Sequence, residues 1–323
     1  MLQLLYSQFV RSRRRYYQRR PEIRRRLTSP VISVGNLTTG GSGKTPLAAE
    51  IARMLVEMGE RPSILSRGYA RQNPSDGVVL VGDGKRILTD AAHAGDEPYM
   101  LARDVPGAAV VVCPSRYLAG RVAESQLRCT VHVLDDGFQH LPLDRDVDLL
   151  VAPPHDFMDV RTLPFGRFRE PVDAAVFADA LLVPLGEPAT PAEMAERLKA
   201  TRAFGFQRRI PTVDTAPPAF AFAGIAKPER FFADLETAGW PLVGRRSFAD
   251  HHGYSSRDMD EIARGARESG AKVMLTTSKD AVRLPQSGPG LDDLPIVEVP
   301  LEISIEPAFR AWLHERLARL RAA

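Results

Sequence analysis

The chain has 323 residues and is 44% hydrophobic, so it can bury a large core, and its length predicts two domains. No stretch approaches the roughly 18 apolar residues of a membrane span, and the two cysteines, Cys113 and Cys129, lie in apolar strand-like runs without the partners of a zinc site. The net charge of +3 combines +8 in residues 1–27, from nine Arg and one Glu, with −5 in the rest. The basic character belongs to one end of the chain, and we expect no nucleic-acid partner.

Residues 2–17 predict a basic amphipathic helix. Its apolar side chains fall mostly on one face, and Arg11, Arg14 and Arg15 lie largely off it. Such a helix is typical of segments that lie in a bilayer interface, where each Arg near an anionic surface adds on the order of 1 kcal/mol. The alternative is a helix that packs on its own domain with a solvated charged face. A secretory signal is not expected, because no apolar stretch follows the charges.

Residues 38–45, Thr-Thr-Gly-Gly-Ser-Gly-Lys-Thr, follow the apolar run 31–35 and precede a helical pattern. This is the strand–loop–helix of a P-loop, whose glycines let backbone N–H groups surround phosphate oxygens. Lys44 would bring charge to the outer phosphates, and Thr45 a hydroxyl to Mg²⁺. The usual pattern has glycine where Thr38 stands, so a chance glycine turn is the alternative. The predicted ATP-binding residues are Thr38, Thr39, Gly40, Gly41, Ser42, Gly43, Lys44 and Thr45.

Apolar strand-like runs alternate with helical patterns after the basic segment. Strands are predicted at 31–35, 62–66, 78–81, 109–113, 130–134, 147–151 and 180–184, and helices at 45–58, 97–104, 115–126 and 191–201. This alternation predicts a mostly parallel sheet with helices on both faces. Together with the P-loop, it indicates a P-loop NTPase-like α/β fold.

A proline-rich stretch, Pro211–Pro218, indicates a linker to a second, smaller α/β domain. Its strands are predicted at 219–223, 242–247, 272–276 and 296–299, and its helices at 228–238 and 256–269. The chain closes with a helix whose apolar stripe is expected in a core. We therefore predict three parts: the basic membrane-interface helix (1–27), the P-loop domain (28–213) and a C-terminal α/β domain (214–323).

Three further groups of residues have side chains suited to chemistry. Asp135 and Asp136 end an apolar run, where P-loop proteins place a carboxylate for Mg²⁺, although many other strands also end in Asp. Asp96 and Glu97 stand at a predicted helix start, where simple N-capping by Asp96 is the alternative. Asp250-His251-His252 occupies a predicted loop, in which the histidines are either half of a metal site or merely solvated.

In their order along the chain, these segments resemble the signature of the tetraacyldisaccharide 4'-kinases, the lipid A 4'-kinase family. The resemblance starts at Val34-Gly35-Asn36-Leu37-Thr38 and residues 40–46, and the odd Thr38 is also what this family shows. It continues through residues 66–69, 95–98, 135–140, 169–171, 222–225, 250–252 and 276–281. Eight motifs in the expected order, over about residues 29–284, make the match highly specific.

The resemblance implies a kinase that transfers the γ-phosphate of ATP to the 4'-hydroxyl of a tetraacyl glucosamine disaccharide 1-phosphate, a lipid A precursor. ATP and Mg²⁺ are the implied cofactors. The partners would be this lipid and an anionic membrane surface, with the protein peripheral to the cytoplasmic face of the bacterial inner membrane. Such a transfer needs positioning, charge neutralisation and a proton acceptor.

We assign Lys44 and the N–H groups of the loop to the phosphates. Asp96 is the predicted general base, with His251 orienting it or sharing the proton; if His251 comes from the second domain, domain closure would complete the site. The predicted metal ligands are Thr45, Asp135, Asp136 and Glu97. The predicted contacts with substrate or phosphate are Arg169, Tyr69 and His140.

Two departures from the family pattern stand out. Residues 163–168, Leu-Pro-Phe-Gly-Arg-Phe, replace what looks more like Leu-Pro-Ala-Gly-Pro-Leu, and Ser278 stands where Glu is usual. Two other functions fit parts of the sequence: a membrane-positioning switch ATPase, and a soluble kinase for a small polar metabolite. The Asp96 and His251 motifs favour an enzyme that phosphorylates an acceptor over a switch.

Overall fold

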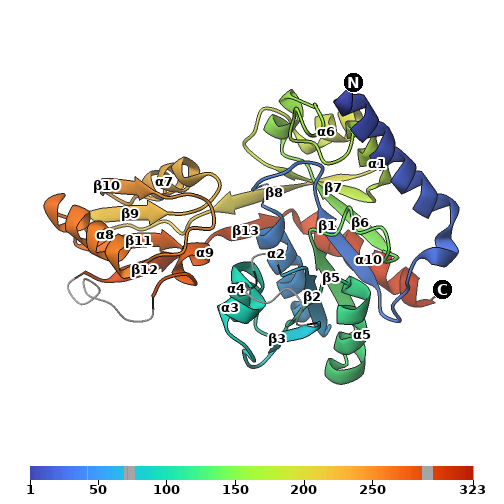
Figure 1. Cartoon of the computed structure of the whole chain (residues 1–323), viewed down its shortest axis with the longest axis horizontal. Coiled ribbons are helices and arrows are strands. Elements are labelled where there is room, and N and C mark those ends of the chain that lie inside the picture. The colour runs from blue at the N-terminus through green and yellow to red at the C-terminus, as the bar shows by residue number, and fades with distance from the viewer. Residues whose placement is uncertain (42, 69–70, 72–76, 286–293, 323) are drawn as a thin grey trace. The chain divides into compact units, whose positions relative to one another are not determined.

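The computed structural model describes residues 1–41, 43–68, 71, 77–285 and 294–322. The chain forms two compact units, coloured by residue number in Figure 1. The first contains residues 1–207 and 303–323, and the second contains residues 208–302. The second unit is therefore inserted between two parts of the first.

The first unit is built on a nine-stranded sheet with the order β13-β8-β7-β6-β1-β5-β2-β4-β3. The strands are β1 (Val31–Gly35), β2 (Pro62–Ser66), β3 (Val79–Asp83), β4 (Ala109–Val112), β5 (Val131–Asp135), β6 (Val147–Val151), β7 (Ala180–Pro184), β8 (Ala203–Arg209) and β13 (Glu302–Ile305). Strand β1 pairs in parallel with β5 and β6, whereas β3 runs antiparallel to β4 at the edge. The central strands are buried along their whole length, as expected for a parallel sheet covered on both faces.

Helices cover both faces of this sheet. On one face, α2 (Lys44–Glu57), α4 (Asp96–Asp104) and α10 (Pro307–Ala322) share a core with Ile32 and Val34. On the other face, α5 (Arg116–Leu127) and α6 (Pro191–Leu198) cover strand residues such as Val31 and Leu150. The other helical segments are α1 (Leu2–Arg19), α3 (Ala91–Ala94), η1 (Pro21–Ile23), η2 (Pro154–Met158) and η3 (Val172–Phe177). The predicted mostly parallel α/β fold is confirmed.

The second unit has its own four-stranded sheet, with the order β10-β9-β11-β12 and parallel pairings. Its elements are β9 (Ala219–Ala223), α7 (Pro228–Thr237), β10 (Leu242–Ser247), α8 (Ser256–Glu268), β11 (Val273–Thr277), α9 (Ser278–Ala281) and β12 (Ile296–Val299). Residues of α7 pack on one face of the sheet and residues of α8 on the other.

The predicted extent of the C-terminal domain, 214–323, needs correction. Strands β8 and β13 were not predicted, and through them the chain returns to the first sheet. The apolar stripe of α10 packs there: Phe309 lies edge-on to Phe204 of β8, with ring centroids 5.4 Å apart. The sequence pattern concealed this return because β13 is only four residues long and buries two of them, Ile303 and Ile305.

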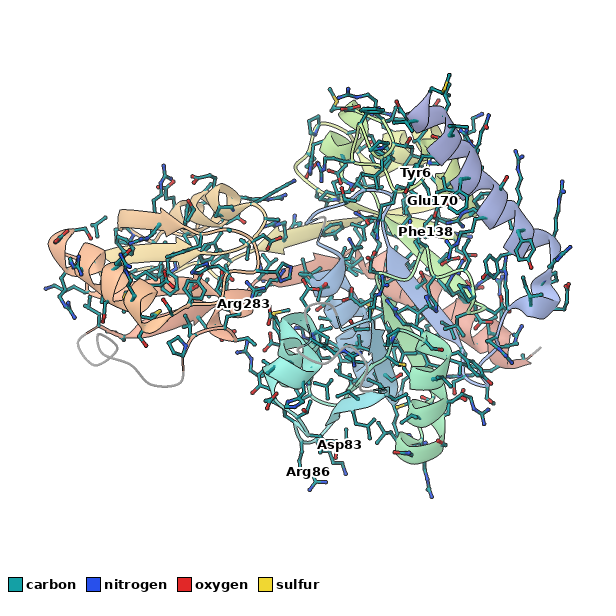
Figure 2. The ribbon with its side chains drawn as sticks, viewed as in Figure 1. Tyr6, Asp83, Arg86, Phe138, Glu170 and Arg283 are labelled. Carbon is teal, nitrogen blue, oxygen red and sulfur yellow. The ribbon has the colours of Figure 1, made fainter. Side chains whose placement is uncertain are left out.

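Helix α1 is attached to the first unit through polar side chains. Arg14 is 5% exposed, donates two 2.7 Å hydrogen bonds to the Glu170 carboxylate, and lies over the ring of Phe138 at 4.6 Å. The Tyr6 hydroxyl donates to the carbonyl of Arg169 at 3.0 Å. Figure 2 labels Tyr6, Phe138 and Glu170 at this junction. The segment predicted as a separate part, 1–27, thus belongs to the first unit.

Several apolar side chains of α1 are exposed to solvent. Leu2, Leu5 and Phe9 are 61%, 56% and 67% exposed. The alternative, a helix that packs on its own domain with a solvated charged face, fits the attachment through Arg14 and Tyr6 but not these three exposed apolar side chains. In the part of the chain that the structure describes, no helix has the length and apolar character to cross a membrane.

Candidate active site

The P-loop lies between the carboxyl end of β1 and the amino end of α2, as predicted. Gly43 caps α2 with a left-handed backbone (φ 83°), a conformation in which glycine avoids the steric cost of a side chain. Thr39, Gly40 and Gly41 are exposed, and Ser42 lies outside the described residues. The loop is therefore open to solvent at the end of a helix whose dipole favours an anion.

Thr38 supports this loop from inside the protein. Its side chain is 2% exposed, and its hydroxyl donates to a carboxylate oxygen of Asp156 at 2.8 Å while accepting from the Asn36 amide at 3.0 Å. A glycine at this position would lose both bonds. Of the predicted ATP-binding residues, Thr38 thus directs its side chain into the core rather than toward a ligand.

Thr45 and Asp135 meet where α2 begins and β5 ends. The Thr45 hydroxyl lies 3.2 Å from one carboxylate oxygen of Asp135 and 3.3 Å from the other. Burial, together with the negative charges of Glu97 and Asp136, raises the pKa of Asp135 to about 7. Burial and the neighbouring acids destabilise the ionised form of Asp135, and a cation bound beside it would stabilise that form.

Asp136 is the centre of a charged group beside the P-loop. Its two carboxylate oxygens each accept a 2.8 Å hydrogen bond from Arg169, and Lys44 Nζ lies 3.7 Å away. Burial favours the neutral acid, but the bonds from Arg169 and the charge of Lys44 outweigh it and hold the pKa of Asp136 below its ordinary value. Burial lowers the pKa of Lys44 despite these acids. The structure thus brings Lys44, Asp136 and Arg169 together.

Asp96 and Glu97 form the first turn of α4. The N-cap is Gly95 and makes no side-chain capping bond, so simple N-capping by Asp96 is wrong. Glu97 is close enough to Asp135 and Lys44 to affect the pKa of both. Glu97 at this helix start therefore lies near the P-loop lysine and the acid that ends β5.

A basic group borders the acids and was only partly predicted. His140 is held neutral, because burial and then the charges of Arg116, Arg145, Arg13 and Arg67 lower its pKa to about 4. Arg116 is 5% exposed, and its Nε has no hydrogen-bond partner among the described residues.

Arg67 and Arg116 were missed as site residues, although a signal existed. Arg67 directly follows β2 and Arg116 starts the helix after β4, so both stand past the carboxyl ends of parallel strands, like Asp136. Tyr69, which was predicted as a contact with substrate or phosphate, lies outside the described residues.

His251 lies in the second unit, in the turn after β10, with a left-handed backbone (φ 63°). Its Nδ1 is 3.1 Å from Arg283 Nη2, and its Nε2 is 3.3 Å from Lys279 Nζ. Asp96 belongs to the first unit, so the predicted pairing of Asp96 with His251 stays a prediction.

His252 is packed rather than solvated. Its ring stacks on Phe248 at a centroid distance of 4.7 Å, and its Nε2 lies 3.2 Å from the Asp258 carboxylate. Across the described ranges, no three His, Cys, Asp or Glu side chains are grouped to hold a metal ion. A metal half-site at these histidines therefore has no support.

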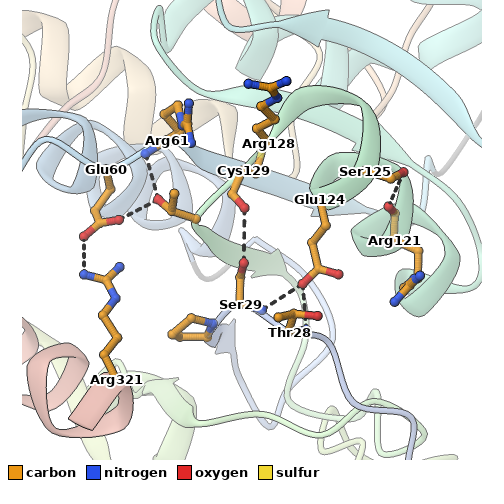
Figure 3. A pocket seen from close by; sticks show the side chains of 12 residues that line it. Thr28, Ser29, Glu60, Arg61, Arg121, Glu124, Ser125, Arg128, Cys129 and Arg321 are labelled. Carbon is orange, nitrogen blue, oxygen red and sulfur yellow. Dashed lines mark hydrogen bonds and ion pairs between the residues drawn. The ribbon is translucent and has the colours of Figure 1, made fainter.

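A cavity of about 700 Å³ lies elsewhere in the first unit (Figure 3). Its lining includes Ser29, Arg61 and Thr130, which precede β1, β2 and β5, so it opens at the amino edge of the parallel strands. The P-loop and the acids stand at the opposite, carboxyl edge. None of the predicted site residues lines this cavity.

The mostly parallel sheet, the loop between β1 and α2, and the strand-end acid facing its Lys-Thr pair define a P-loop nucleotide-binding protein. The model of the LpxK family, described as tetraacyldisaccharide-1-P 4'-kinase, matches residues 1–318. The chain therefore belongs to this family.

Individual relatives agree with this assignment. A tetraacyldisaccharide 4'-kinase of Desulfotalea psychrophila is 40% identical over 88% of this chain and 86% of its own length. One of Geobacter sulfurreducens is 38% identical over 94% of this chain and 90% of its own length. The crystal structure of "apo" form LpxK from Aquifex aeolicus in complex with ATP is similar, with a TM-score of 0.77 and 28% identity, covering 98% of this chain and 100% of that one.

Proposed function

We propose that the protein transfers the γ-phosphate of ATP to the 4'-hydroxyl of a tetraacyl glucosamine disaccharide 1-phosphate, a step of lipid A synthesis. The observation that carries the proposal is the Lys44-Thr45 pair, which faces Asp135 and Asp136 in a chain of this kinase family. The relatives bear the name tetraacyldisaccharide 4'-kinase, and the similar crystal structure contains ATP.

The loop and α2 bind the phosphates of the nucleotide in this proposal. Backbone N–H groups around Gly40, Gly41 and Gly43 surround the anion, and Lys44 leaves Asp136 to neutralise charge that develops on the transferred group. Arg169 holds Asp136 in place with two hydrogen bonds, so that the acid stays ionised when Lys44 turns to the nucleotide.

Mg²⁺ fits the residues at the end of β5. The Thr45 hydroxyl and Asp135 offer oxygen ligands 3.2 Å apart, and Mg²⁺ usually takes one or two carboxylates with phosphate oxygens and water. Asp135, whose ionised form burial opposes, would hold it, with Asp136 and Glu97 close by. When bound, the ion supplies charge neutralisation between the outer phosphates.

Asp96 accepts the proton of the acceptor hydroxyl, and His251 orients it or shares the proton. This assignment is supported by the place of Asp96 in the first turn of α4, next to Glu97, whose charge acts on Lys44 and Asp135. The basic group of Arg67, Arg116 and His140 is suited to a phosphate of the acceptor, because a partnerless buried guanidinium Nε gains from an anion.

The acceptor has acyl chains and stays in a bilayer, and α1 would bring the protein to it. Its exposed Leu2, Leu5 and Phe9 accompany several arginines and no acid between Leu2 and Arg19. This combination favours the surface of an anionic membrane. The cytoplasmic face of the bacterial inner membrane supplies such a surface together with ATP.

The test is a transfer reaction with the full-length protein. We would incubate it with γ-labelled ATP and tetraacyl disaccharide 1-phosphate in detergent micelles, and locate the new phosphate by mass spectrometry. Label at the 4'-position, absent with Lys44→Ala, is expected. Label on a different acceptor, or ATP hydrolysis with nucleotide-dependent dimerisation and no labelled lipid, would contradict the proposal.

A further inference from the structure

We propose that residues 158–168, which we call the tip loop, form a second contact with an anionic bilayer, and that this contact sets the position of the P-loop. The inference rests on the proposed function, because a substrate held in a bilayer gives the contact its use. It concerns residues outside the phosphate-transfer site and assigns them a coupling role.

The tip loop presents large apolar side chains to solvent. Met158, Val160 and Phe165 are 83%, 44% and 59% exposed. Exposed apolar side chains that gather on one segment mark an interaction surface, whereas single scattered ones do not. The neighbouring helix α1 indicates that the partner of this surface is a bilayer.

The tip loop is joined to α1, the helix that carries the other exposed apolar residues. The Ser7 and Thr162 hydroxyls are 2.9 Å apart, and these residues are 8% and 3% exposed. Just beyond the loop, the backbone carbonyl of Arg169 accepts a hydrogen bond from the Tyr6 hydroxyl of α1. A helix that seats on a membrane therefore brings the tip loop to the same surface.

Charge complementarity favours an anionic bilayer. Helix α1 has no Asp or Glu between Leu2 and Arg19, and the tip loop adds Arg161 and Arg167 against the single acid Asp159. Apolar side chains flanked by arginines are the composition of segments that insert into the interface of anionic membranes.

The tip loop is closed tightly enough to move as a body. The N–H groups of Gly166 and Phe168 donate to the carbonyls of Thr162 and Arg161 at 3.0 and 3.1 Å, and Leu163 N–H donates to the Phe168 carbonyl at 2.9 Å. A Cβ on Gly166 would lie 2.0 Å from the Arg161 carbonyl oxygen, so the turn has no room for a side chain there.

Arg167 connects this body to the P-loop. Its carbonyl accepts the Thr39 N–H at 2.8 Å, and its guanidinium donates to the Thr39 carbonyl at 2.8 Å and to Asp156 at 3.1 Å. Asp156 also accepts the Thr38 hydroxyl at 2.8 Å. Phe165 thus lies two residues before Arg167, which with Asp156 forms hydrogen bonds to the first two residues of the P-loop.

Such a connection has a reciprocal consequence. If seating of the tip loop favours the P-loop arrangement that binds nucleotide, vesicles must tighten nucleotide binding, and nucleotide must tighten vesicle binding by the same factor. Coupling of this kind typically amounts to about fivefold or more. The equality of the two factors distinguishes coupling from two independent binding events.

The experiment measures this cycle on the full-length protein. The probes are a non-hydrolysable ATP analogue and vesicles of phosphatidylethanolamine and phosphatidylglycerol. We expect vesicles to tighten analogue binding by wild type. Phe165→Ser should weaken vesicle binding on the order of tenfold, because an inserted aromatic side chain is lost. It should leave analogue binding in solution, and turnover of detergent-dispersed substrate, unchanged.

Arg167→Ala should still bind vesicles, with the vesicle effect on analogue binding lost. The matched control is Ile87→Ser, which changes an exposed apolar side chain (40% exposed) in the turn after β3. It should behave as wild type in every measurement.

The inference is overturned if Phe165→Ser binds vesicles like wild type, or if vesicles leave analogue binding by wild type unchanged. It is also overturned if the exposed side chains serve self-association, seen as a wild-type dimer that Phe165→Ser converts to a monomer without loss of vesicle binding. Failure of the proposed function is separate: it appears as no labelled disaccharide from wild type in detergent, where the tip loop plays no part.

Discussion

The carboxylates at the amino edge of the large sheet differ from Asp135 at its carboxyl edge. At the amino edge, beside the cavity, Glu124 accepts 2.7 Å hydrogen bonds from the N–H groups of both Thr28 and Ser29. There, too, the hydrogen bond from Arg321 holds the pKa of Glu60 below its ordinary value. At the carboxyl edge, burial and neighbouring acids raise the pKa of Asp135 to about 7.

The difference distinguishes carboxylates that stabilise the fold from one that is suited to bind a cation. Carboxylates at the amino edge are provided with donors by the protein itself, so their ionised form stabilises the fold. The ionised form of Asp135 is destabilised by its surroundings, and a bound cation would offset this destabilisation. A buried acid with a raised pKa at the end of a parallel strand is therefore a better indicator of a site than the presence of a cavity.

The largest effect on activity is expected at the carboxyl edge with Lys44→Ala. Loss of the charge beside the phosphates should lower turnover by on the order of 10²–10³-fold, because the developing charge is no longer neutralised. The rate of transfer to the disaccharide in detergent measures this. Turnover within about threefold of wild type, or less than roughly 0.7 kcal/mol of barrier, would contradict the role of Lys44.

Asp135→Asn should separate activity from stability. Turnover should fall on the order of 10²-fold with the loss of a charged ligand. The native pKa is raised above the unfolded one, so the stabilisation from the neutral acid is complete below about pH 4 and is lost as pH rises through 7.

Removing this acid should therefore stabilise the protein at pH 8 by up to about 4 kcal/mol in chelator, as measured by urea unfolding. At about pH 3, where the acid is mostly neutral in both states, the two proteins should unfold alike. A variant that is less stable than wild type at pH 8 would show that the pKa of Asp135 is not raised.

Glu124→Ala is the counterpart at the amino edge. It leaves the N–H groups of Thr28 and Ser29 without their acceptor, and should cost about 1 kcal/mol of unfolding free energy. Turnover per folded molecule should match wild type. If activity fell while stability held, the two edges would not differ in function as described.

The last effect is on the pH dependence of stability and concerns His140. Its pKa is lowered to about 4, so between pH 4 and 6.5 the unfolded chain binds a proton that the native protein does not. Stability should fall as pH drops through this window, by up to about 1.4 kcal/mol per pH unit from this group. His140→Asn should flatten the slope; equal slopes for both proteins would refute the lowered pKa.

Much of the site was predictable because its residues follow strands. Apolar runs of four to five residues located β1 and β5; Lys44 stands at the end of the loop after β1, Asp135 ends β5 and Asp136 follows it. The support of Thr38 by Asp156 was not predictable, since 118 residues separate the two and no local pattern connects them.

The fold was predictable up to the point where the chain returns to the first sheet through β13. β13 and α10 follow an inserted unit, and nothing local indicates that a short strand after Pro300 pairs with β8 rather than with its immediate predecessors. The polar attachment of α1 escaped prediction for a related reason: the buried Arg14 looks like any other arginine of the basic face until Glu170 is placed beside it.

The return of the chain to the first sheet has a consequence for synthesis on the ribosome. β13 and α10 are translated after the inserted second unit, and Phe204 and Phe206 of β8 share their core. Until α10 has been translated, the nucleotide-binding unit keeps an uncovered apolar edge, although its phosphate loop was made long before. A polypeptide cut short by premature termination would therefore expose this edge to proteases, and faulty copies would be removed before they reach a membrane.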